Sequence, residues 1–236
     1  MAEVPADPRR ERGMRAQSEF LRTRLADGAR QVGWKAGFGS PQGLAALGLT
    51  APLVGFLLDT GARSSGATID TSRWTKPVIE AEVAAVLAVD VPGDVAPSGV
   101  GAYVAGLVPA LEVADVDLPP EDPEAILAGD IFQRAFVVGE QPGSGPVSGG
   151  LDCTGWVGRV TVGDEPEVEV VDLAALTGRF EDVLAQVARD AAAYGRGLLA
   201  GDVVLLGSIV PPVPVRPGDA VRYRLADHPE LALAFA

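Results

Sequence analysis

Three glutamates in two apolar segments are the residues that could do chemistry together. Glu80 and Glu82 are two apart in the segment at 78–89, and Glu112 lies in the apolar stretch at 103–116. On a strand, side chains two apart share a face, with Cα atoms about 6.5–7 Å apart, so both carboxylates can reach one cation. A third carboxylate from a neighbouring strand would complete an all-oxygen set with positions left for water or substrate, which suits a hard cation. We expect Glu80, Glu82 and Glu112 to bind Mg²⁺ or Mn²⁺.

The pair Glu80 and Glu82 also has a simpler interpretation. An E-x-E pattern is common, and the two side chains could form the exposed face of an edge strand. Glu112 argues against this interpretation because it lies inside the apolar run PALEVA at 109–114. A carboxylate in such a place must be paired, hydrogen-bonded or bound to a metal. On the residues alone, both interpretations stay open.

Lys35 is the second candidate for chemistry. The chain has 19 basic residues, and Lys35 and Lys76 are the two lysines among them. Lys35 lies between glycines in the segment GWKAGFGS at 33–40. An ammonium group can release a proton whereas a guanidinium cannot, so we expect Lys35 to be catalytic. The alternative is a chance exposed lysine near a turn.

Some reaction types are disfavoured by the residues that the sequence lacks. His228 is the one histidine and Cys153 the one cysteine, which argues against Ser-His-Asp or Cys-His machinery, against zinc on His or Cys ligands, and against an internal disulfide. The segment 1–14 lacks the apolar stretch of a signal peptide, and no apolar run approaches the ~20 residues that span a membrane. We expect a cytoplasmic protein with no membrane partner.

The net charge restricts the class of ligand. The formal net charge is −13, with 47% hydrophobic and 22% charged residues, the composition of a folded globular protein. Such a chain should repel nucleic acid and anionic membrane surfaces. An anionic substrate would need a local reversal of the field, which a divalent cation held by carboxylates supplies.

The elements that must position these residues are mostly strands. The hydrophobic pattern predicts helices at 14–29 and 180–194, a strand leading into a turn at 33–40, and further strands at 78–89, 131–138, 202–210, 220–225 and 231–235. The buried face of the first helix should contain Met14, Phe20, Leu21, Leu25 and Ala29. Residues 1–13 are expected to be a loose arm, and 139–150 a loop. We predict an N-terminal arm and helix at 1–30 and a single catalytic domain at 31–236.

Four segments in this order resemble the 2-keto-4-pentenoate hydratase / 2-oxohepta-3-ene-1,7-dioate hydratase group of the fumarylacetoacetate hydrolase superfamily. Residues 33–37 (GWKAG) are similar to the G-[YW]-K-[IV]-G segment with the active-site lysine. Residues 78–84 (VIEAEVA) and 109–115 (PALEVAD) are similar to the segments that carry the metal-binding glutamates. Residues 201–208 (GDVVLLGS) with 217–219 (PGD) are similar to the C-terminal ending. The resemblance runs from about residue 15 to the end of the sequence.

The resemblance implies a mixed α+β, β-rich fold: the mixed β-roll of the fumarylacetoacetate hydrolase C-terminal domain, with a short N-terminal helical region. It also implies that the cation binds the carboxylate and the keto or enol oxygens of a small 2-oxo acid. The cation would stabilise an enolate while Lys35 or a bound water moves protons. Relatives are at least dimers, so a homodimer or higher homo-oligomer is expected.

The sequence departs from this group around the expected pocket. Where relatives read E-P-D-F-G, this chain has APLVG at 51–55, which replaces an acid with Leu53; where they read D-N-A-S, it has DIFQ at 130–133. The G-L-T-S and T-G-S segments have also changed. We expect a more apolar pocket, and the residues that should contact substrate are Ser40, Leu53, Phe132, Gly207 and Ser208.

Three functions follow from these observations. The first is a metal-dependent lyase that hydrates, dehydrates or decarboxylates a 2-oxo or 2-hydroxydienoic acid through a metal-stabilised enolate. The second is a repurposed family member that isomerises, cyclises or cleaves a more apolar β-dicarbonyl compound in a specialised pathway. The third is a non-catalytic partner subunit of an active relative.

Overall fold

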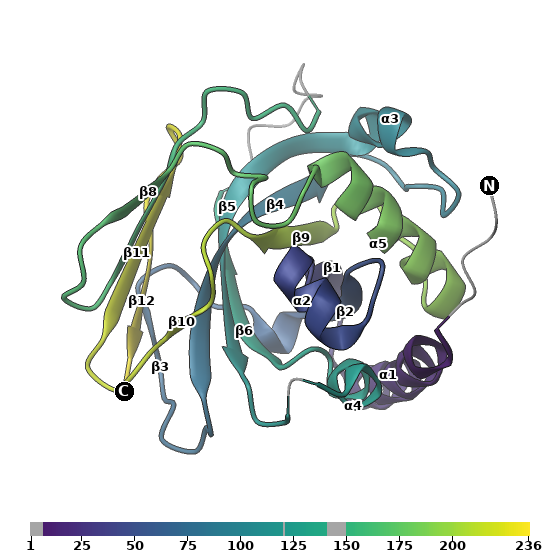
Figure 1. The fold of residues 1–236 in the computed structure, drawn as a ribbon, viewed down its shortest axis with the longest axis horizontal. Coiled ribbons are helices and arrows are strands. Elements are labelled where there is room, and N and C mark those ends of the chain that lie inside the picture. The colour runs from purple at the N-terminus through teal and green to yellow at the C-terminus, as the bar shows by residue number, and fades with distance from the viewer. Residues whose placement is uncertain (1–6, 120, 141–149) are drawn as a thin grey trace.

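A curled sheet of seven strands forms the centre of the molecule (Figure 1). The computed structural model describes residues 7–119, 121–140 and 150–236. The strand order is β2-β1-β9-β4-β5-β6, and β10 adds to β4. The strands are β1 (Gln31–Gly37), β2 (Leu53–Leu58), β4 (Pro77–Leu87), β5 (Val104–Asp115), β6 (Gln133–Val138), β9 (Val203–Ser208) and β10 (Val213–Pro214).

A second sheet of five strands, in the order β3-β12-β11-β7-β8, packs beside the first. Its strands are β3 (Ala67–Ile69), β7 (Gly158–Val162), β8 (Val168–Val170), β11 (Ala220–Leu225) and β12 (Leu231–Phe235). Alternate residues of β11, Val221, Tyr223 and Leu225, are fully buried. They belong to one hydrophobic core with Leu111 and Val113 of β5, so the main core includes residues of both sheets.

Helices cover the other side of the curled sheet. Figure 1 shows α5 along this side, α1 beside α4, and α2 within the curl. The helices are α1 (Pro8–Ala26), α2 (Pro41–Leu47), α3 (Pro97–Val100), α4 (Pro123–Ala128) and α5 (Phe180–Tyr194), with 3-10 turns at Asp59–Gly61 and Gly101–Tyr103. Within the described ranges, none of these helices has the length and apolar character needed to cross a membrane.

Much of the predicted secondary structure is confirmed. The helix expected at 180–194 is α5, and the strand expected at 78–89 is β4, which begins at Pro77 and ends at Leu87. The C-terminal hairpin is β11 and β12. The division into parts at 1–30 and 31–236 stays a prediction.

The N-terminal helix differs from its prediction in both start and buried face. It begins at Pro8, within the expected loose arm, because the Asp7 side chain accepts from the backbone N–H of Arg9 and the proline is favoured at the first turn. Gly13, Met14, Gln17 and Leu21 are its buried residues. Phe20 and Leu25, expected inside, are 41% and 39% exposed. Residues 1–6 of the expected arm lie outside the described residues.

The strand expected at 131–138 begins two residues later. Asp130, Ile131 and Phe132 have φ angles of 59°, 51° and 63°, in the left-handed region that non-glycine residues rarely adopt. Each such residue costs on the order of 1–3 kcal/mol and persists only where its surroundings hold it. Here the N–H of Phe56 donates to Asp130 at 2.8 Å, and the N–H of Ile131 donates to the carbonyl of Ile126 at 2.8 Å. Of the loop expected at 139–150, residues 141–149 lie outside the described residues.

Candidate metal centre and active site

Strand pairing brings the three glutamates together. In the antiparallel pairing of β4 and β5, Glu80 lies directly opposite Glu112. Glu82 follows two residues later on β4 and lies opposite Ser208 of β9. One carboxylate oxygen from each glutamate lies within 4.8 Å of the others. Because β4 is paired on both sides, the interpretation of Glu80 and Glu82 as an exposed edge is wrong.

The curl of the large sheet brings Lys35 to the same place. Lys35 lies on β1, which β9 and β4 separate from β5 in the sheet order. In a flat sheet, three strand spacings would place β1 about 14 Å from β5. The ammonium Nζ of Lys35 nevertheless donates to Glu112 Oε1, and it also donates to the carbonyl of Ile131 at 3.1 Å. Lys35 is 1% exposed, which excludes a chance surface lysine.

Asp130 is a fourth acid beside this group. It is 3% exposed, and a Cβ atom placed on Gly55 would lie 2.7 Å from Asp130 Oδ1 and 3.1 Å from Lys35 Cγ. Because Gly55 has no side chain, Asp130 and Lys35 can both pack directly against the backbone of β2. Four carboxylates and one ammonium, almost all removed from water, leave a large excess of negative charge if every group is ionised.

The pKa values reflect this excess. Burial, followed by the charge of Glu112, raises the pKa of Glu80 to about 7. Burial together with Glu112 and Glu80 raises the pKa of Glu82 well above its usual value, and burial also raises that of Asp130. Burial works against the charged form of Lys35, but the charges of Glu112 and Glu80 outweigh it and raise the pKa of Lys35. The ammonium is therefore protonated at neutral pH, and the carboxylates need a further cation to be stably ionised.

The donor set fits a hard divalent cation. All three groups supply carboxylate oxygens, which Mg²⁺ and related ions prefer. Glu112 Oε2 is buried and has no hydrogen-bond partner among the described residues, so one ligand oxygen is free. Glu82 is oriented through its Oε2, which accepts from the N–H of Gly207 at 2.8 Å. Gly207 has a φ of 108°, and a Cβ atom there would meet Thr177 Cγ2 at 2.7 Å, so this donor depends on a glycine.

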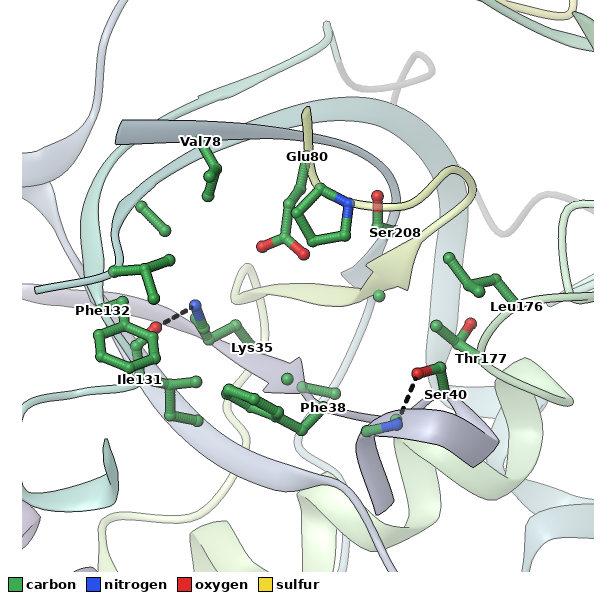
Figure 2. A pocket seen from close by; sticks show the side chains of 18 residues that line it. Lys35, Phe38, Ser40, Val78, Glu80, Ile131, Phe132, Leu176, Thr177 and Ser208 are labelled. Atoms are coloured by element: carbon green, nitrogen blue, oxygen red, sulfur yellow. Dashed lines mark hydrogen bonds between the residues drawn. The ribbon is translucent and has the colours of Figure 1, made fainter. Parts of the chain in front are cut away.

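A cavity of about 240 Å³ opens beside the glutamates (Figure 2). Lys35 and Glu80 both face it, and their charged ends approach each other near its middle. One end is apolar: Phe38, Ile131 and Phe132 lie beside Lys35, and they pack in one cluster with Val78 and Val116, which also line the cavity. The other end carries hydroxyl groups from Ser40, Thr177 and Ser208, beside Leu176.

Four of the five predicted substrate-contact residues line this cavity: Ser40, Phe132, Gly207 and Ser208. Ser40 Oγ also accepts from the N–H of Gly43 and begins α2. The Ser208 hydroxyl has one proton and two carbonyl acceptors within reach, that of Val210 at 2.6 Å and that of Ala81 at 3.1 Å. Leu53 is not among the lining residues. Its strand partner is Gly37, and it is two residues from Gly55, the partner of Lys35, so its side chain lies on the same face of the sheet as Lys35. It is fully buried in the cluster that contains Ile131 and Phe132, which do line the cavity, so Leu53 packs in the cavity wall without reaching the cavity.

Two residues near the site were not singled out from the sequence. Asp130 belongs to a segment that departs from the family pattern, and the apolar residues that follow it could have indicated burial. A buried acid must be paired, hydrogen-bonded or bound to a metal. Thr177 comes from the segment before α5, far in sequence from the other residues. Its hydroxyl Oγ1 is buried without a partner among the described residues. A lone threonine in a turn gives no sequence signal of this kind.

Known proteins with similar sequences and structures include decarboxylases and hydratases. A 4-oxalocrotonate decarboxylase from a Pseudomonas species is 32% identical over 211 residues, 87% of this chain and 79% of that protein. The 2-oxo-hept-4-ene-1,7-dioate hydratase of Escherichia coli is 29% identical over 211 residues, 86% of this chain and 78% of that protein. The structure of 4-oxalocrotonate decarboxylase from Pseudomonas putida G7, complexed with magnesium and adipate, superposes with a TM-score of 0.83 at 26% identity, and covers 95% of this chain and 85% of that one.

These relatives confirm the predicted fold and the predicted enzyme class, a metal-dependent lyase of hydratase or decarboxylase type. They also support the use of a divalent metal. Residues 47–234, most of the chain, match the fumarylacetoacetate (FAA) hydrolase C-terminal family. The chain therefore belongs to the fumarylacetoacetate hydrolase family.

Proposed function

We propose that this chain is a divalent-metal-dependent lyase that acts on a small 2-oxo or 2-hydroxydienoic acid. The observation that carries the proposal is the group of Glu80, Glu82 and Glu112, with the ammonium of Lys35 paired to Glu112, at the wall of a cavity. The carboxylates outnumber the ammonium, so this group carries excess negative charge that a cation can balance. The cavity beside it has a suitable size for a short organic acid.

The three glutamates would hold the cation, and Gly207 would keep Glu82 oriented through its N–H. When bound, the cation supplies positive charge to the oxygens of a 2-oxo acid, which lowers the cost of negative charge that develops on them during the reaction. It also lets a chain with a net charge of −13 accept an anion.

Lys35 would donate a proton from Nζ to the substrate. Its raised pKa keeps it protonated, and its two contacts with Glu112 and the carbonyl of Ile131 fix the direction of the ammonium. The apolar side chains of Ile131 and Phe132 exclude water from this side of the cavity. A proton donor held in a dry site at one position is the arrangement that general acid catalysis needs.

Hydration of a 2-hydroxy-2,4-dienoic acid is one balanced form of this reaction. The enol proton is lost and a proton is added at C5, which leaves a double bond between C3 and C4 conjugated to the keto group. The oxygen of water then bonds to C4 and keeps one of its hydrogens, and the other hydrogen of water goes to C3 as a proton. One water is consumed, and neither an oxidant nor a reductant is needed.

Two measurements test the proposal. Calorimetric titration with Mg²⁺ should show binding to the wild type and none to Glu82→Gln, which keeps the shape of the side chain but removes its charge. The ultraviolet absorbance of 2-hydroxypenta-2,4-dienoate should fall when enzyme and Mg²⁺ are both present. Equal Mg²⁺ affinity of the two proteins would overturn the assignment of the ligands, and unchanged absorbance of this and longer dienoates would overturn the reaction.

We further propose that the chain forms a homodimer or higher homo-oligomer and works in the cytoplasm. Phe20 and Leu25 support association, because both are large, apolar and exposed on α1. The single cysteine, Cys153, suits a reducing compartment. Light scattering at micromolar concentration would contradict association if it gave the mass of one chain.

A further inference from the structure

The two ends of the cavity differ in what they can bind. The end with Ser40, Thr177 and Ser208 offers hydroxyl groups, and the Thr177 hydroxyl is buried and unpartnered among the described residues. The opposite end offers an apolar cluster whose cavity-lining members are Phe38, Val78, Val116, Ile131 and Phe132. Figure 2 shows Phe38, Ile131 and Phe132 grouped on the Lys35 side, and Ser40 and Thr177 on the far side.

Charge is distributed just as unevenly. Among the described residues that line the cavity, Lys35 is the one basic side chain. Its ammonium already pairs with Glu112 and donates to the carbonyl of Ile131. Apart from this paired ammonium, the described residues that line the apolar end offer no cation to pair with a second carboxylate of a substrate, and no hydroxyl or amide side chain that could replace one.

We propose that this enzyme selects unsaturated 2-oxo acids with one carboxylate and a short apolar tail, and discriminates against dicarboxylates. This inference rests on the function proposed above. The 2-oxo acid head lies at the glutamates and the hydroxyl end, and the tail packs against Phe38, Val116 and Phe132. A tail carboxylate would be removed from water without a partner, which is costly.

The selectivity also assigns the class of reaction. A lyase that releases CO₂ from the tail needs a second carboxylate on the substrate, whereas hydration needs only the conjugated double bonds. The wall of this cavity therefore favours addition of water over loss of CO₂. One similar enzyme, the 4-oxalocrotonate decarboxylase from Pseudomonas putida G7, forms a complex with magnesium and the dicarboxylate adipate, a class of ligand that this cavity should disfavour.

The test uses unreactive analogues, so that it does not depend on turnover. Calorimetry with Mg²⁺ compares 2-oxopentanoate with 2-oxohexanedioate, which differ in the tail carboxylate. We expect the monocarboxylate to bind about 100-fold more tightly, as expected for an unpaired carboxylate in an apolar site. Equal or tighter binding of the dicarboxylate would overturn this inference and leave the lyase proposal standing. If neither acid binds in the presence of Mg²⁺, the lyase proposal itself fails.

A matched pair of variants locates the effect. Val116 is half-buried at the apolar end, and Val116→Lys should raise the affinity for the dicarboxylate relative to the monocarboxylate by about tenfold or more, whereas Val116→Met, of similar length, should not. Lys76 tests whether a cation outside the cavity could hold the tail carboxylate. It is exposed, and it lies next to Val116, because its carbonyl accepts from the N–H of Val116. If Lys76→Met weakens dicarboxylate binding more than monocarboxylate binding, a cation outside the cavity holds the tail, and the inference is wrong.

Discussion

Replacing Glu80 by glutamine should stabilise the metal-free protein while it removes metal binding. Without a cation, ionised Glu80 shares a buried region with Glu82 and Glu112, and the one ammonium of Lys35 already pairs with Glu112. Glutamine keeps the shape of the side chain and removes its charge. We therefore expect Glu80→Gln to unfold at higher urea concentration than the wild type in the presence of a chelator at pH 8.

The size of the effect follows from the pKa of Glu80. Its pKa rises from 4.5 to about 7 in the folded protein, and one pKa unit corresponds to about 1.36 kcal/mol, so the ionised form lowers the free energy of unfolding by about 3 kcal/mol. Because the folded pKa is the higher one, this loss is absent below pH 4.5 and grows as the pH rises towards 7. It is complete above that value. The two proteins should therefore be equally stable near pH 4.5 and differ most at pH 8.

Urea unfolding at pH 4.5, 6 and 8, with chelator and with saturating Mg²⁺, measures this difference. Glu165→Gln is the control, because it removes one charge from an exposed turn residue and accounts for the general effect of net charge. Added Mg²⁺ should stabilise the wild type and the control but not Glu80→Gln. A Glu80→Gln protein that is no more stable than the control at pH 8 without metal would refute the electrostatic description of this site.

Two further substitutions test the roles of Lys35 and Gly207. Lys35→Met should lower kcat about 10²–10⁴-fold at saturating Mg²⁺, and Lys35→Arg should not restore it, because a guanidinium does not release a proton; a Lys35→Arg enzyme near wild-type kcat would contradict the proton-transfer role. Gly207→Ala should lower the free energy of unfolding by about 1–3 kcal/mol and weaken Mg²⁺ binding, since its φ is 108° and the added Cβ meets Thr177. Gly201→Ala, with a φ of 83° in open space, should leave Mg²⁺ affinity unchanged; an equal loss of affinity in both variants would contradict the role of Gly207.

The sequence predicted the strands and the helix whose patterns are regular. Strand β4 and helix α5 were found because their periodicity is unbroken over many residues. The first turn of α1 was missed because Asp7 and Pro8 act through capping, which hydrophobic periodicity does not register. The late start of β6 was missed because the left-handed backbone at Ile131 and Phe132 is imposed by contacts with other parts of the chain.

The sequence indicates which residues belong to the candidate site better than it indicates how those residues contact one another. Strand periodicity places Glu80 and Glu82 on one face, the apolar surroundings of Glu112 add a third carboxylate, and the resemblance groups all three with Lys35. The direct pairing of Lys35 with Glu112 was not predictable, because it depends on the curl of the sheet. Leu53 lies on the same face of the β1–β2 pair as Lys35 but packs against the side chains that line the cavity, and a change of residue type does not reveal whether a side chain reaches the cavity or packs in its wall.

The position of β9 in the large sheet has a consequence for how the active site forms during synthesis. This strand comes late in the chain, yet it lies between β1, which carries Lys35, and β4, which carries two of the glutamates. Pairings between such distant segments must overcome the entropy of closing long loops, so they form slowly. The glutamates can meet without β9, because β4 and β5 pair directly, but Lys35 on β1 is not held beside them until β9 has left the ribosome and inserted. The complete site, with Lys35 beside the glutamates and the N–H of Gly207 on Glu82, therefore forms only after this insertion.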